Sequence, residues 1–421
     1  MRFRSLTPLF KRKYSVISKN SIAVLNFPLS NFNVDFLCNK DNVQCIQENI
    51  QKRKGVGDIL KVQEIYENIR SDKFNNEKLR NEFLNEINKI PNDTHPDVFN
   101  MGDEPKIVKP CLNKPQFSHE PLDFTTIAKK LNLLRTEHLG NLTGHRSYVL
   151  LGELAELEQA LIKFTVANLC KRGFVLLSVP DILPSQIIEK CGMNTKGERN
   201  QVYALDEKHG ENLCLSGTSE MAIAGFLMNK TFPEDQLPLK LAAVSRCYRA
   251  ETSNIHEERG IYRVHQFTKV EMFGVTRENE SNQFLEEFRL IEEDNFTALD
   301  IPYRVLDMPP HELGAPAYRK YDIEAWYPGR KMFGEISSCS NCTDYQSRRL
   351  NIKYENKQGE THFVHTLNGT ACAIPRMLIG LIEVNQQSNG TIKIPKILQP
   401  FMDSKEIISK NKKIPQLKLI K

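Results

Sequence analysis

A densely charged segment between two apolar runs is the part of this chain whose residues are best suited to chemistry. It reads RAETSNIHEERGIYRVHQFTKVE from Arg249 to Glu271. The flanking runs, Leu239–Tyr248 and Val270–Val275, have the composition of strands, and the polar stretch Thr252–Gly260 lies between them. This pattern predicts an antiparallel hairpin with a long tip.

Alternation of side chains along the two strands would gather these charges on one face. Arg249 and Glu251 would share a face of the first strand. The residues expected on one face of the second strand are Arg263, His265, Phe267, Lys269 and Glu271. Because unpaired buried charge is costly, such a face is poor core material and would suit a polyanion with a flat ring, such as a nucleotide. On composition alone, a solvated charged hairpin is the alternative.

Further segments place polar residues in ordered clusters on both sides of this hairpin. Thr218, Ser219 and Glu220 lie in LSGTSEM, before it. After it come GEISSCSNCTDYQSRRLNIKY, residues 334–354, and TLNGTACAIPR, residues 366–376. GFVLLSVP, residues 173–180, reads as a strand that ends at a proline.

Taken in order, these segments resemble the motifs of class II aminoacyl-tRNA synthetases. GFVLLSVP is similar to motif 1, residues 249–271 to motif 2, and residues 366–376 to motif 3. The form R-x-E…Y-R-V-H-Q-F-x-K-V-E is similar to that of seryl-tRNA synthetases. The resemblance runs from about His119 to Met402. It implies an α+β fold, with a mostly antiparallel sheet flanked by helices, and a homodimer formed through motif 1.

The resemblance implies a serine–tRNA ligase that makes seryl-adenylate from L-serine and ATP and transfers serine to tRNA(Ser). The first step needs charge stabilisation and alignment at the α-phosphate, and no protein nucleophile. The implied catalytic residues are Arg249, Glu335 and Arg376. A planar guanidinium such as that of Arg249 can bridge a carboxylate and a phosphate. Arg376, near a helix start, would meet the γ-phosphate.

The resemblance also implies how the nucleotide is held. Glu251 would accept a hydrogen bond from the adenine amino group, Phe267 would stack on the purine, and the backbone of Val264 would border it. The implied ATP-binding set is Arg249, Ala250, Glu251, Val264, Phe267, Glu335, Ile336, Ser337, Ser338 and Arg376. Mg²⁺ that accompanies ATP would take hard oxygen ligands from Glu335 and Ser338.

Serine would need an anionic partner for its α-ammonium group and hydrogen-bonding partners for its hydroxyl. The residues that the resemblance places there are Thr218, Ser219, Glu220, Arg249, Glu271, Asn368 and Thr370. His265 could be a general base, but serine enters with its carboxylate already ionised, which favours a histidine that only shapes the strand.

The first 34 residues contain no Asp or Glu but several Arg, Lys and Ser residues. This composition predicts a mitochondrial transit peptide over residues 1–34, with a disordered basic arm as the alternative. The ten cysteines are scattered without paired spacing, which favours a reducing compartment. We therefore expect the mitochondrial matrix. The sequence contains no run of 18 apolar residues, so no membrane span is predicted.

Residues 35–118 are expected to form an N-terminal helical arm and a linker, followed by the catalytic domain over residues 119–421. Apolar residues at helical spacing predict a helical hairpin, with limbs over about Ile59–Ile69 and Leu79–Ile90 and a turn over 72–76. The family's arm is longer, so the resemblance does not imply that the arm of this chain contacts tRNA in the way that the family's arm does. The segment IPNDTHPD, residues 90–97, is similar to the signature that follows the family's arm. The helix predicted over 152–169 would end at Gly173.

Three rival functions are weaker. A catalytically silent synthetase-like mitochondrial paralogue would be expected to have lost some of the motif residues, and all are present. A class II ligase for another amino acid fits the TSE and SCSNC segments less well. The net charge of +5 suits a nucleic-acid partner, but a plain RNA-binding protein would not need the motif carboxylates. A zinc site at Cys339 and Cys342 is also disfavoured, because no second pair of ligands follows at the spacing that zinc sites use.

Overall fold

The structure, a computed structural model, describes residues 15–16, 25–71, 76–136, 146–197, 200–251 and 260–415, with side chains from Phe27 onward. Most of the predicted transit peptide, residues 72–75 of the predicted turn in the arm and residues 252–259 of the predicted hairpin tip lie outside these residues. Among the described residues, no helix combines the length and apolar character needed to cross a membrane.

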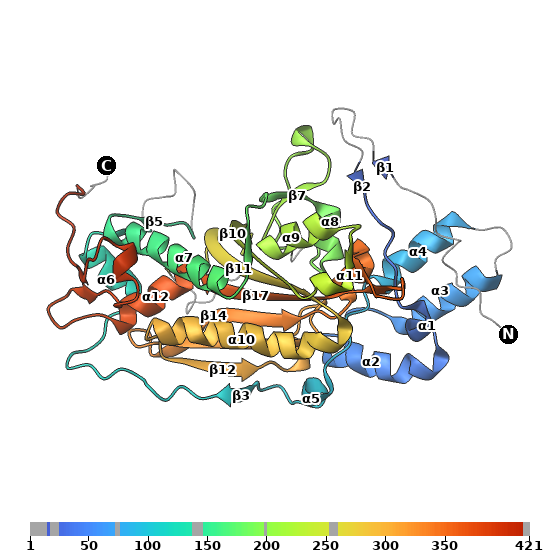
Figure 1. The fold of residues 1–421 in the computed structure, drawn as a ribbon, viewed down its shortest axis with the longest axis horizontal. Coiled ribbons are helices and arrows are strands. Elements are labelled where there is room, and N and C mark those ends of the chain that lie inside the picture. The colour runs from blue at the N-terminus through green and yellow to red at the C-terminus, as the bar shows by residue number, and fades with distance from the viewer. Residues whose placement is uncertain are drawn as a thin grey trace.

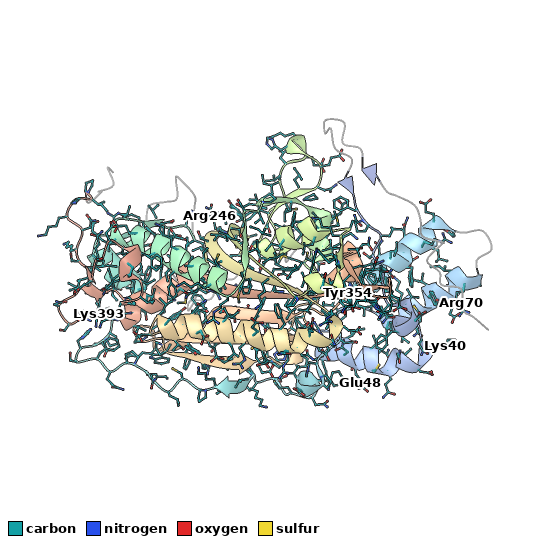
Figure 2. All side chains as sticks on the ribbon, viewed as in Figure 1. Lys40, Glu48, Arg70, Arg246, Tyr354 and Lys393 are labelled. Carbon is teal, nitrogen blue, oxygen red and sulfur yellow. The ribbon has the colours of Figure 1, made fainter. Side chains whose placement is uncertain are left out.

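The N-terminal helices form the predicted hairpin and pack around a small core of their own. They are α1 (Val34–Leu37), α2 (Val43–Lys52), α3 (Ile59–Ser71) and α4 (Glu77–Ile87). The paired helices α3 and α4 span 13 and 11 residues, so the arm is short. Figure 2 labels Lys40, Glu48 and Arg70 on this arm, where acidic and basic side chains are interspersed.

The arm and the turn that follows it are both fastened to the main domain. Arg53, at the end of α2, donates hydrogen bonds to the carbonyl oxygens of Ala317 at 2.7 Å and Gly314 at 2.5 Å. Asn92 donates to the carbonyl oxygens of Pro316 and Cys342 at 2.8 and 2.9 Å. The similarity of residues 90–97 to the family signature therefore has a structural cause, because this turn docks the arm on the domain.

The main domain is built on an eight-stranded sheet with the order β3-β12-β13-β14-β17-β11-β10-β6. Its strands are β3 (Lys106–Lys109), β6 (Val175–Leu177), β10 (Leu239–Tyr248), β11 (Gln266–Thr276), β12 (Tyr303–Asp307), β13 (Arg319–Tyr327), β14 (Met332–Asn341) and β17 (His365–Ala373). Every pairing is antiparallel except that of β6 with β10. The predicted mostly antiparallel sheet is confirmed.

Helices and short strands surround this sheet (Figure 1). The helices are α5 (Pro96–Phe99), α6 (Phe124–Lys130), α7 (Glu153–Lys171), α8 (Ser185–Lys190), α9 (Ser219–Leu227), α10 (Ser281–Ala298), α11 (Tyr345–Leu350) and α12 (Ile374–Val384). The short strands pair as β1 (Ser15–Val16) with β2 (Leu25–Asn26), β4 (Leu134–Arg135) with β5 (Val149–Leu150), β7 (Ile182–Pro184) with β8 (Leu213–Leu215), β15 (Lys353–Glu355) with β9 (Thr231–Pro233) and β16 (Thr361–Phe363), and β18 (Ile392–Lys393) with β19 (Ile407–Ile408). The predicted helix over 152–169 is α7, and Gly173 follows its end with a φ of +86°.

The charged hairpin forms, but its strands differ from the prediction. β10 ends at Tyr248, and the backbone of Glu251 has a φ of +27°, so Arg249 and Glu251 do not share a strand face by alternation. β11 begins only at Gln266, so Arg263 and His265 precede the strand. Simple alternation therefore applies only to the later residues of the second strand.

Two β-bulges lie in the strands that border the charged face. The pairing of β13 with β14 slips between Ile323 and Glu324, which leaves Ile336 as an extra residue. The pairing of β11 with β17 slips between Val270 and Glu271, which leaves Ala371 as an extra residue. Because a bulge re-aims the side chains that follow it, residues three apart can face the same side of the sheet.

Helix α10 packs against the face of the sheet opposite the charged one (Figure 1). Gly369 of β17 faces this helix, and a Cβ atom there would lie 2.8 Å from Oε1 of Glu292. Glu292 is fully buried, beside the side chains of Ser337 and Cys339. Burial raises the pKa of Glu292 well above its ordinary value. This carboxyl group therefore ionises less readily in the folded protein than in the unfolded chain.

Replacement of Glu292 by glutamine is expected to make stability less dependent on pH. Below pH 4.5 the carboxyl group is protonated in both the folded and the unfolded protein. Above pH 4.5 it ionises freely only in the unfolded protein, so the wild type loses stability as pH rises. The lost free energy of unfolding is about 1.4 kcal/mol per pH unit. Between pH 5 and 8, the melting temperature of Glu292→Gln should rise relative to that of the wild type as the pH increases. A constant difference, as expected for the exposed Glu64→Gln control, would contradict this account.

Candidate active site

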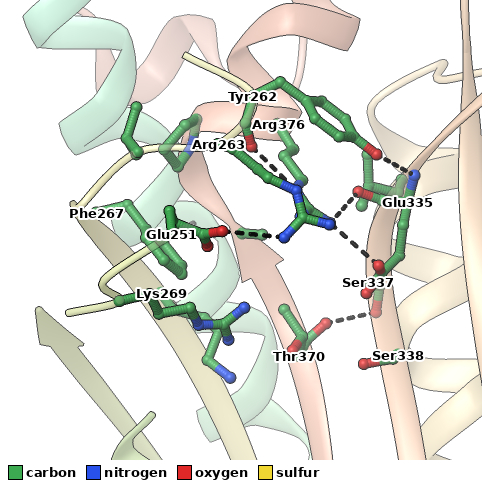
Figure 3. A pocket seen from close by; sticks show the side chains of 15 residues that line it. Glu251, Tyr262, Arg263, Phe267, Lys269, Glu335, Ser337, Ser338, Thr370 and Arg376 are labelled. Atoms are coloured by element: carbon green, nitrogen blue, oxygen red, sulfur yellow. Dashed lines mark hydrogen bonds and ion pairs between the residues drawn. The ribbon is translucent and has the colours of Figure 1, made fainter. Parts of the chain in front are cut away.

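A pocket opens on the charged face of the sheet, over β11, β17 and β14. Figure 3 shows Phe267 and Lys269 on β11 across the pocket from Ser338 on β14, with Thr370 of β17 between them. Arg376 enters from the first turn of α12. Three adjacent strands and one helix start thus supply most of the walls.

The pocket gathers ten of the residues that the sequence analysis assigned to a site. They are Arg249, Glu251, Val264, Phe267, Glu335, Ile336, Ser337, Ser338, Thr370 and Arg376. The remaining six assigned residues do not line it: Thr218, Ser219, Glu220, Ala250, Glu271 and Asn368. Five lining residues were not predicted as site residues: Tyr262, Arg263, Lys269, Ala373 and Pro375.

Arg249 presents a cation that protein groups leave partly unsatisfied. Its Nε is buried and finds no hydrogen-bond partner among the described residues. Its guanidinium carbon lies 5.2 Å from the centre of the Phe267 ring. A buried donor without a partner is uncommon in folded proteins and fits a place where an anionic ligand binds.

The backbone of Arg249 is held by its neighbour across the hairpin. Its N–H donates to the carbonyl oxygen of His265 at 3.0 Å, and its carbonyl oxygen lies 3.1 Å from Nδ1 of His265. The same ring nitrogen lies 2.8 Å from the hydroxyl of Tyr203. These contacts give His265 a structural role, as the sequence analysis favoured.

Arg376 and Glu335 form an ion pair inside the pocket. Nη1 of Arg376 lies 3.2 Å from Oε2 of Glu335 and donates to its backbone carbonyl oxygen at 2.9 Å. Nε of Arg376 donates to the carbonyl oxygen of Tyr262 at 3.3 Å. Removal from water acts to raise the pKa of Glu335, but Arg376, Lys320 and Arg249 outweigh it and lower that pKa. Glu335 is therefore a carboxylate at neutral pH.

Two further charge pairs lie at the other side of the pocket. Arg263 donates from Nη1 to Oε2 of Glu251 at 3.1 Å. Lys269 and Glu271 form a buried ion pair two residues apart on β11. Glu271 thus lies below the pocket surface, while Lys269 reaches the pocket wall.

Most of the six assigned residues outside the pocket lie close together. Thr218 caps α9, since its hydroxyl accepts a hydrogen bond from the backbone N–H of Glu220. Oε1 of Glu220 accepts hydrogen bonds from Gln346 at 2.6 Å and Asn368 at 3.0 Å. Burial and the nearby Glu271 raise the pKa of Glu220 to about 7. A second polar cluster, centred on Glu220, therefore adjoins the pocket through Glu271 and Lys269.

The pocket has the donor groups that Mg²⁺ bound to a nucleotide requires. Mg²⁺ usually takes one or two carboxylate oxygens from the protein and the rest from phosphates and water. Glu335 is a carboxylate on the pocket wall, and the hydroxyl of Ser338 lies on the same strand and wall. Among the described residues, no group of three or more His, Cys, Asp or Glu side chains forms a self-sufficient metal site.

The unpredicted residues had weak signals in the sequence. Lys269 alternates with Phe267 and Glu271, so its face was visible, but a lysine on a strand gives no hint of a particular ligand. Gln346 lies inside the 334–354 segment, yet nothing in the sequence connects it with Glu220. Its role depends on a contact between residues 126 positions apart.

Comparisons with known proteins agree with this geometry. A family model described as tRNA synthetase class II core domain (G, H, P, S and T) matches residues 203–385. The mitochondrial serine–tRNA ligase of Mus musculus is 45% identical over 334 residues, which cover 78% of this chain and 64% of that protein. The chain thus spans less than two thirds of the length of this mitochondrial relative.

Two other relatives are covered more fully. The serine–tRNA ligase of Treponema denticola is 43% identical over 320 residues, or 75% of each chain. The crystal structure of the seryl-tRNA synthetase from Pyrococcus horikoshii in complex with ATP superposes with a TM-score of 0.76 and 30% identity, covering 90% of each chain. The similarity therefore includes the arm as well as the main domain.

Proposed function

The chain belongs to the seryl-tRNA synthetase family, and we propose that it is a serine–tRNA ligase that activates L-serine with ATP and transfers it to tRNA(Ser). One observation carries this proposal. The pocket with Arg249, Glu335 and Arg376 adjoins the carboxyl group of Glu220 through Lys269 and Glu271. A nucleotide phosphate site beside a site for an ammonium group is what amino-acid activation requires.

The pocket residues divide the work on ATP. Phe267 offers a ring face for the purine, and Glu251 and the backbone of Val264 lie at the same end of the pocket. Arg249, held through its backbone, places its guanidinium where it can stabilise charge on the α-phosphate as the serine carboxylate attacks. Arg376 meets the terminal phosphate, and Mg²⁺ held by Glu335 and Ser338 would neutralise phosphate charge.

The cluster around Glu220 suits the amino-acid substrate. Glu220 and Glu271 supply negative charge for the α-ammonium group, while Thr218 and Thr370 supply hydroxyls near the serine side chain. Groups placed to bond the substrate hydroxyl would be left unpaired by alanine, which would therefore be rejected. Ser219 and Asn368 complete the assigned set, with Asn368 bonded to Glu220.

Serine-dependent exchange of pyrophosphate into ATP tests the proposed activity. We expect exchange with serine and none with alanine, followed by charging of transcribed serine tRNAs. A well-folded protein without exchange would support the alternative, a silent synthetase-like paralogue. Exchange without tRNA charging would retain the activation step and remove tRNA(Ser) as the acceptor.

The affinity for serine is expected to fall below neutral pH. Because the raised pKa of Glu220 is about 7, its carboxylate is lost as pH drops through that value. The KM for serine in the exchange reaction should rise about tenfold per pH unit below 7, since protonation removes the partner of the ammonium group. The KM for ATP should change much less. Glu220→Gln should give a high serine KM that does not vary with pH, and a wild-type KM that is flat from pH 6 to 8 would contradict this role.

We also propose that the protein works in the mitochondrial matrix, after import directed by its basic N-terminal segment. The mitochondrial relative and the absence of Asp and Glu from residues 1–34 support this location. Import of the full chain into isolated mitochondria, with protection from added protease, tests it.

A homodimer formed at β6 is the proposed assembly. β6 is an edge strand, and Val175 and Leu176 on it are 59% and 47% exposed. An exposed apolar edge invites pairing with a second chain. Light scattering should give twice the chain mass of 48.4 kDa for the wild type and the single mass for Leu176→Asp. The control Ile407→Asp, at an equally exposed position, should remain dimeric. A monomeric wild type would rule this interface out.

A further inference from the structure

A short segment before the arm lies against the main domain. We name this segment, residues Phe27–Asn33, the N-terminal strap. Figure 1 shows the dark blue chain leaving β2 and passing α11 before it reaches α1. Phe27 packs against the second hydrophobic core of the domain. The backbone N–H of Asn31 donates to the carbonyl oxygen of Arg348 at 2.8 Å.

The strap supplies two of the three acceptors of a half-buried lysine. Nζ of Lys190, at the end of α8, donates to the carbonyl oxygen of Pro28 at 2.9 Å and the hydroxyl of Ser30 at 3.1 Å. It also donates to the carbonyl oxygen of Arg349, at the end of α11, at 3.0 Å. Burial and the nearby Arg349 lower the pKa of Lys190 to about 8. Without the strap, a poorly hydrated ammonium group would lose two of its three acceptors.

The strap also covers the guanidinium group of Arg349. This residue is 4% exposed, and its guanidinium carbon lies 3.3 Å from the ring centre of Tyr345 and 4.9 Å from that of Phe32. Its Nε donates to the side-chain oxygen of Asn88 at 3.2 Å. Phe32 therefore closes one side of a buried cation that also ties the arm to α11.

The two helices joined in this way hold the residues around Glu220. Gln346, three positions before Arg349 on α11, donates to Oε1 of Glu220 at 2.6 Å. It also lies 3.4 Å from the carbonyl oxygen of Cys191, which directly follows Lys190. Its own side-chain oxygen accepts from Thr366 at 2.8 Å. A shift of α11 relative to α8 would therefore move the amide group that orients Glu220.

We propose that the N-terminal strap is a positioning element of the serine pocket and that it stays on the mature protein. It fastens α8 to α11 through Lys190 and Arg349, and this fixes Gln346 and Glu220. Its effect on serine rests on the proposed function, whereas its effect on stability does not. Any cleavage during import would then occur before Phe27, and not after residue 34.

The test replaces residues 27–33 of the full chain with seven glycine and serine residues. We expect a loss of several degrees in melting temperature and a serine KM about tenfold higher, with the KM for ATP within twofold, since misplacement of a binding group costs affinity for the substrate it holds. Phe32→Ala should shift both values in the same direction and serves if the replacement does not fold. In a Lys190→Met background, the replacement should change both values less than it does in the wild type, because only the contacts of Phe27, Asn31 and Phe32 remain to be lost.

The outcomes separate the parts of the proposal. Unchanged melting temperature and serine KM would overturn it, and a lower melting temperature with an unchanged serine KM would overturn the positioning role. No exchange in the unaltered chain would count against the proposed function alone, and the melting temperatures would still decide whether the strap fastens the helices. N-terminal sequencing of the imported protein should find a first residue at or before Phe27. A start at or beyond Val34 would overturn retention of the strap.

Discussion

Replacement of Arg249 by alanine is expected to lower serine-dependent pyrophosphate exchange by about a thousandfold, because one preorganised charge at a transition state is worth roughly 3–4 kcal/mol. Nε of Arg249 is buried without a partner among the described residues, so the free protein has no other use for this donor. Its removal should therefore disturb the fold little. The initial exchange rate at saturating ATP and serine measures the effect, and the melting temperature should stay within a few degrees.

Two companions make the Arg249 result specific. Arg249→Lys keeps the charge but loses the planar fork that can bridge a carboxylate and a phosphate, so it should recover only a small part of the rate. Arg172→Ala removes an exposed arginine at the end of α7 that pairs with Asp294 of α10, and this variant should exchange like the wild type. Activity of Arg249→Ala within tenfold of the wild type would exclude a role at the α-phosphate.

Two thirds of the residues that line this pocket were predictable from sequence, because their order along the chain resembles that of a known family. Ten of the assigned residues do line one cavity. Their geometry was not predictable, because alternation along regular strands gives the wrong face for several. Glu335 and Ser338 are three residues apart and would point to opposite sides of a regular strand. The bulge at Ile336 brings both to the pocket.

The same limit applies to Thr370 and Ala373, which line the pocket on either side of the extra residue Ala371. A bulge depends on the register between two strands, and register is a long-range property that one strand's sequence does not carry. The partner of Glu220 was hidden for a similar reason. Gln346 reaches it only because α11 packs against the helices α8 and α9.

The arm was predicted by its helical periodicity, since Val62, Ile65, Phe83 and Ile87 do form its core. What the periodicity could not give was the attachment of the arm to the domain. That attachment consists of hydrogen bonds from Arg53 and Asn92 to backbone carbonyl groups more than 200 residues away. Backbone acceptors have no signature in side-chain patterns, so contacts of this kind are found only from the structure.

Replacement of Glu335 is expected to have the second-largest effect, and glutamine is the most informative substitution. Nη1 of Arg376 bonds both the side chain and the backbone carbonyl oxygen of Glu335. Glu335→Gln keeps the backbone contact and the shape, but it removes the negative charge that suits Mg²⁺. We expect exchange to fall about a hundredfold at ordinary Mg²⁺ concentrations, as for loss of one preorganised charged group. The Mg²⁺ concentration for half-maximal exchange should rise.

The dependence on Mg²⁺ separates two roles for this carboxylate. If Glu335 served only to hold Arg376, its loss would lower the rate equally at every Mg²⁺ concentration, and Arg376→Lys would reproduce the defect. If it holds the metal, added Mg²⁺ should restore part of the rate in Glu335→Gln and none in Arg376→Lys. Glu324→Gln is the matched control, because Glu324 pairs with Glu335 across the strands while its carboxylate bonds Arg304. Since Glu324 does not line the pocket, Glu324→Gln should show the wild-type Mg²⁺ dependence. A changed Mg²⁺ dependence in this control would mean that any loss of negative charge near β13 and β14 alters Mg²⁺ binding, and a metal contact by Glu335 would not be needed.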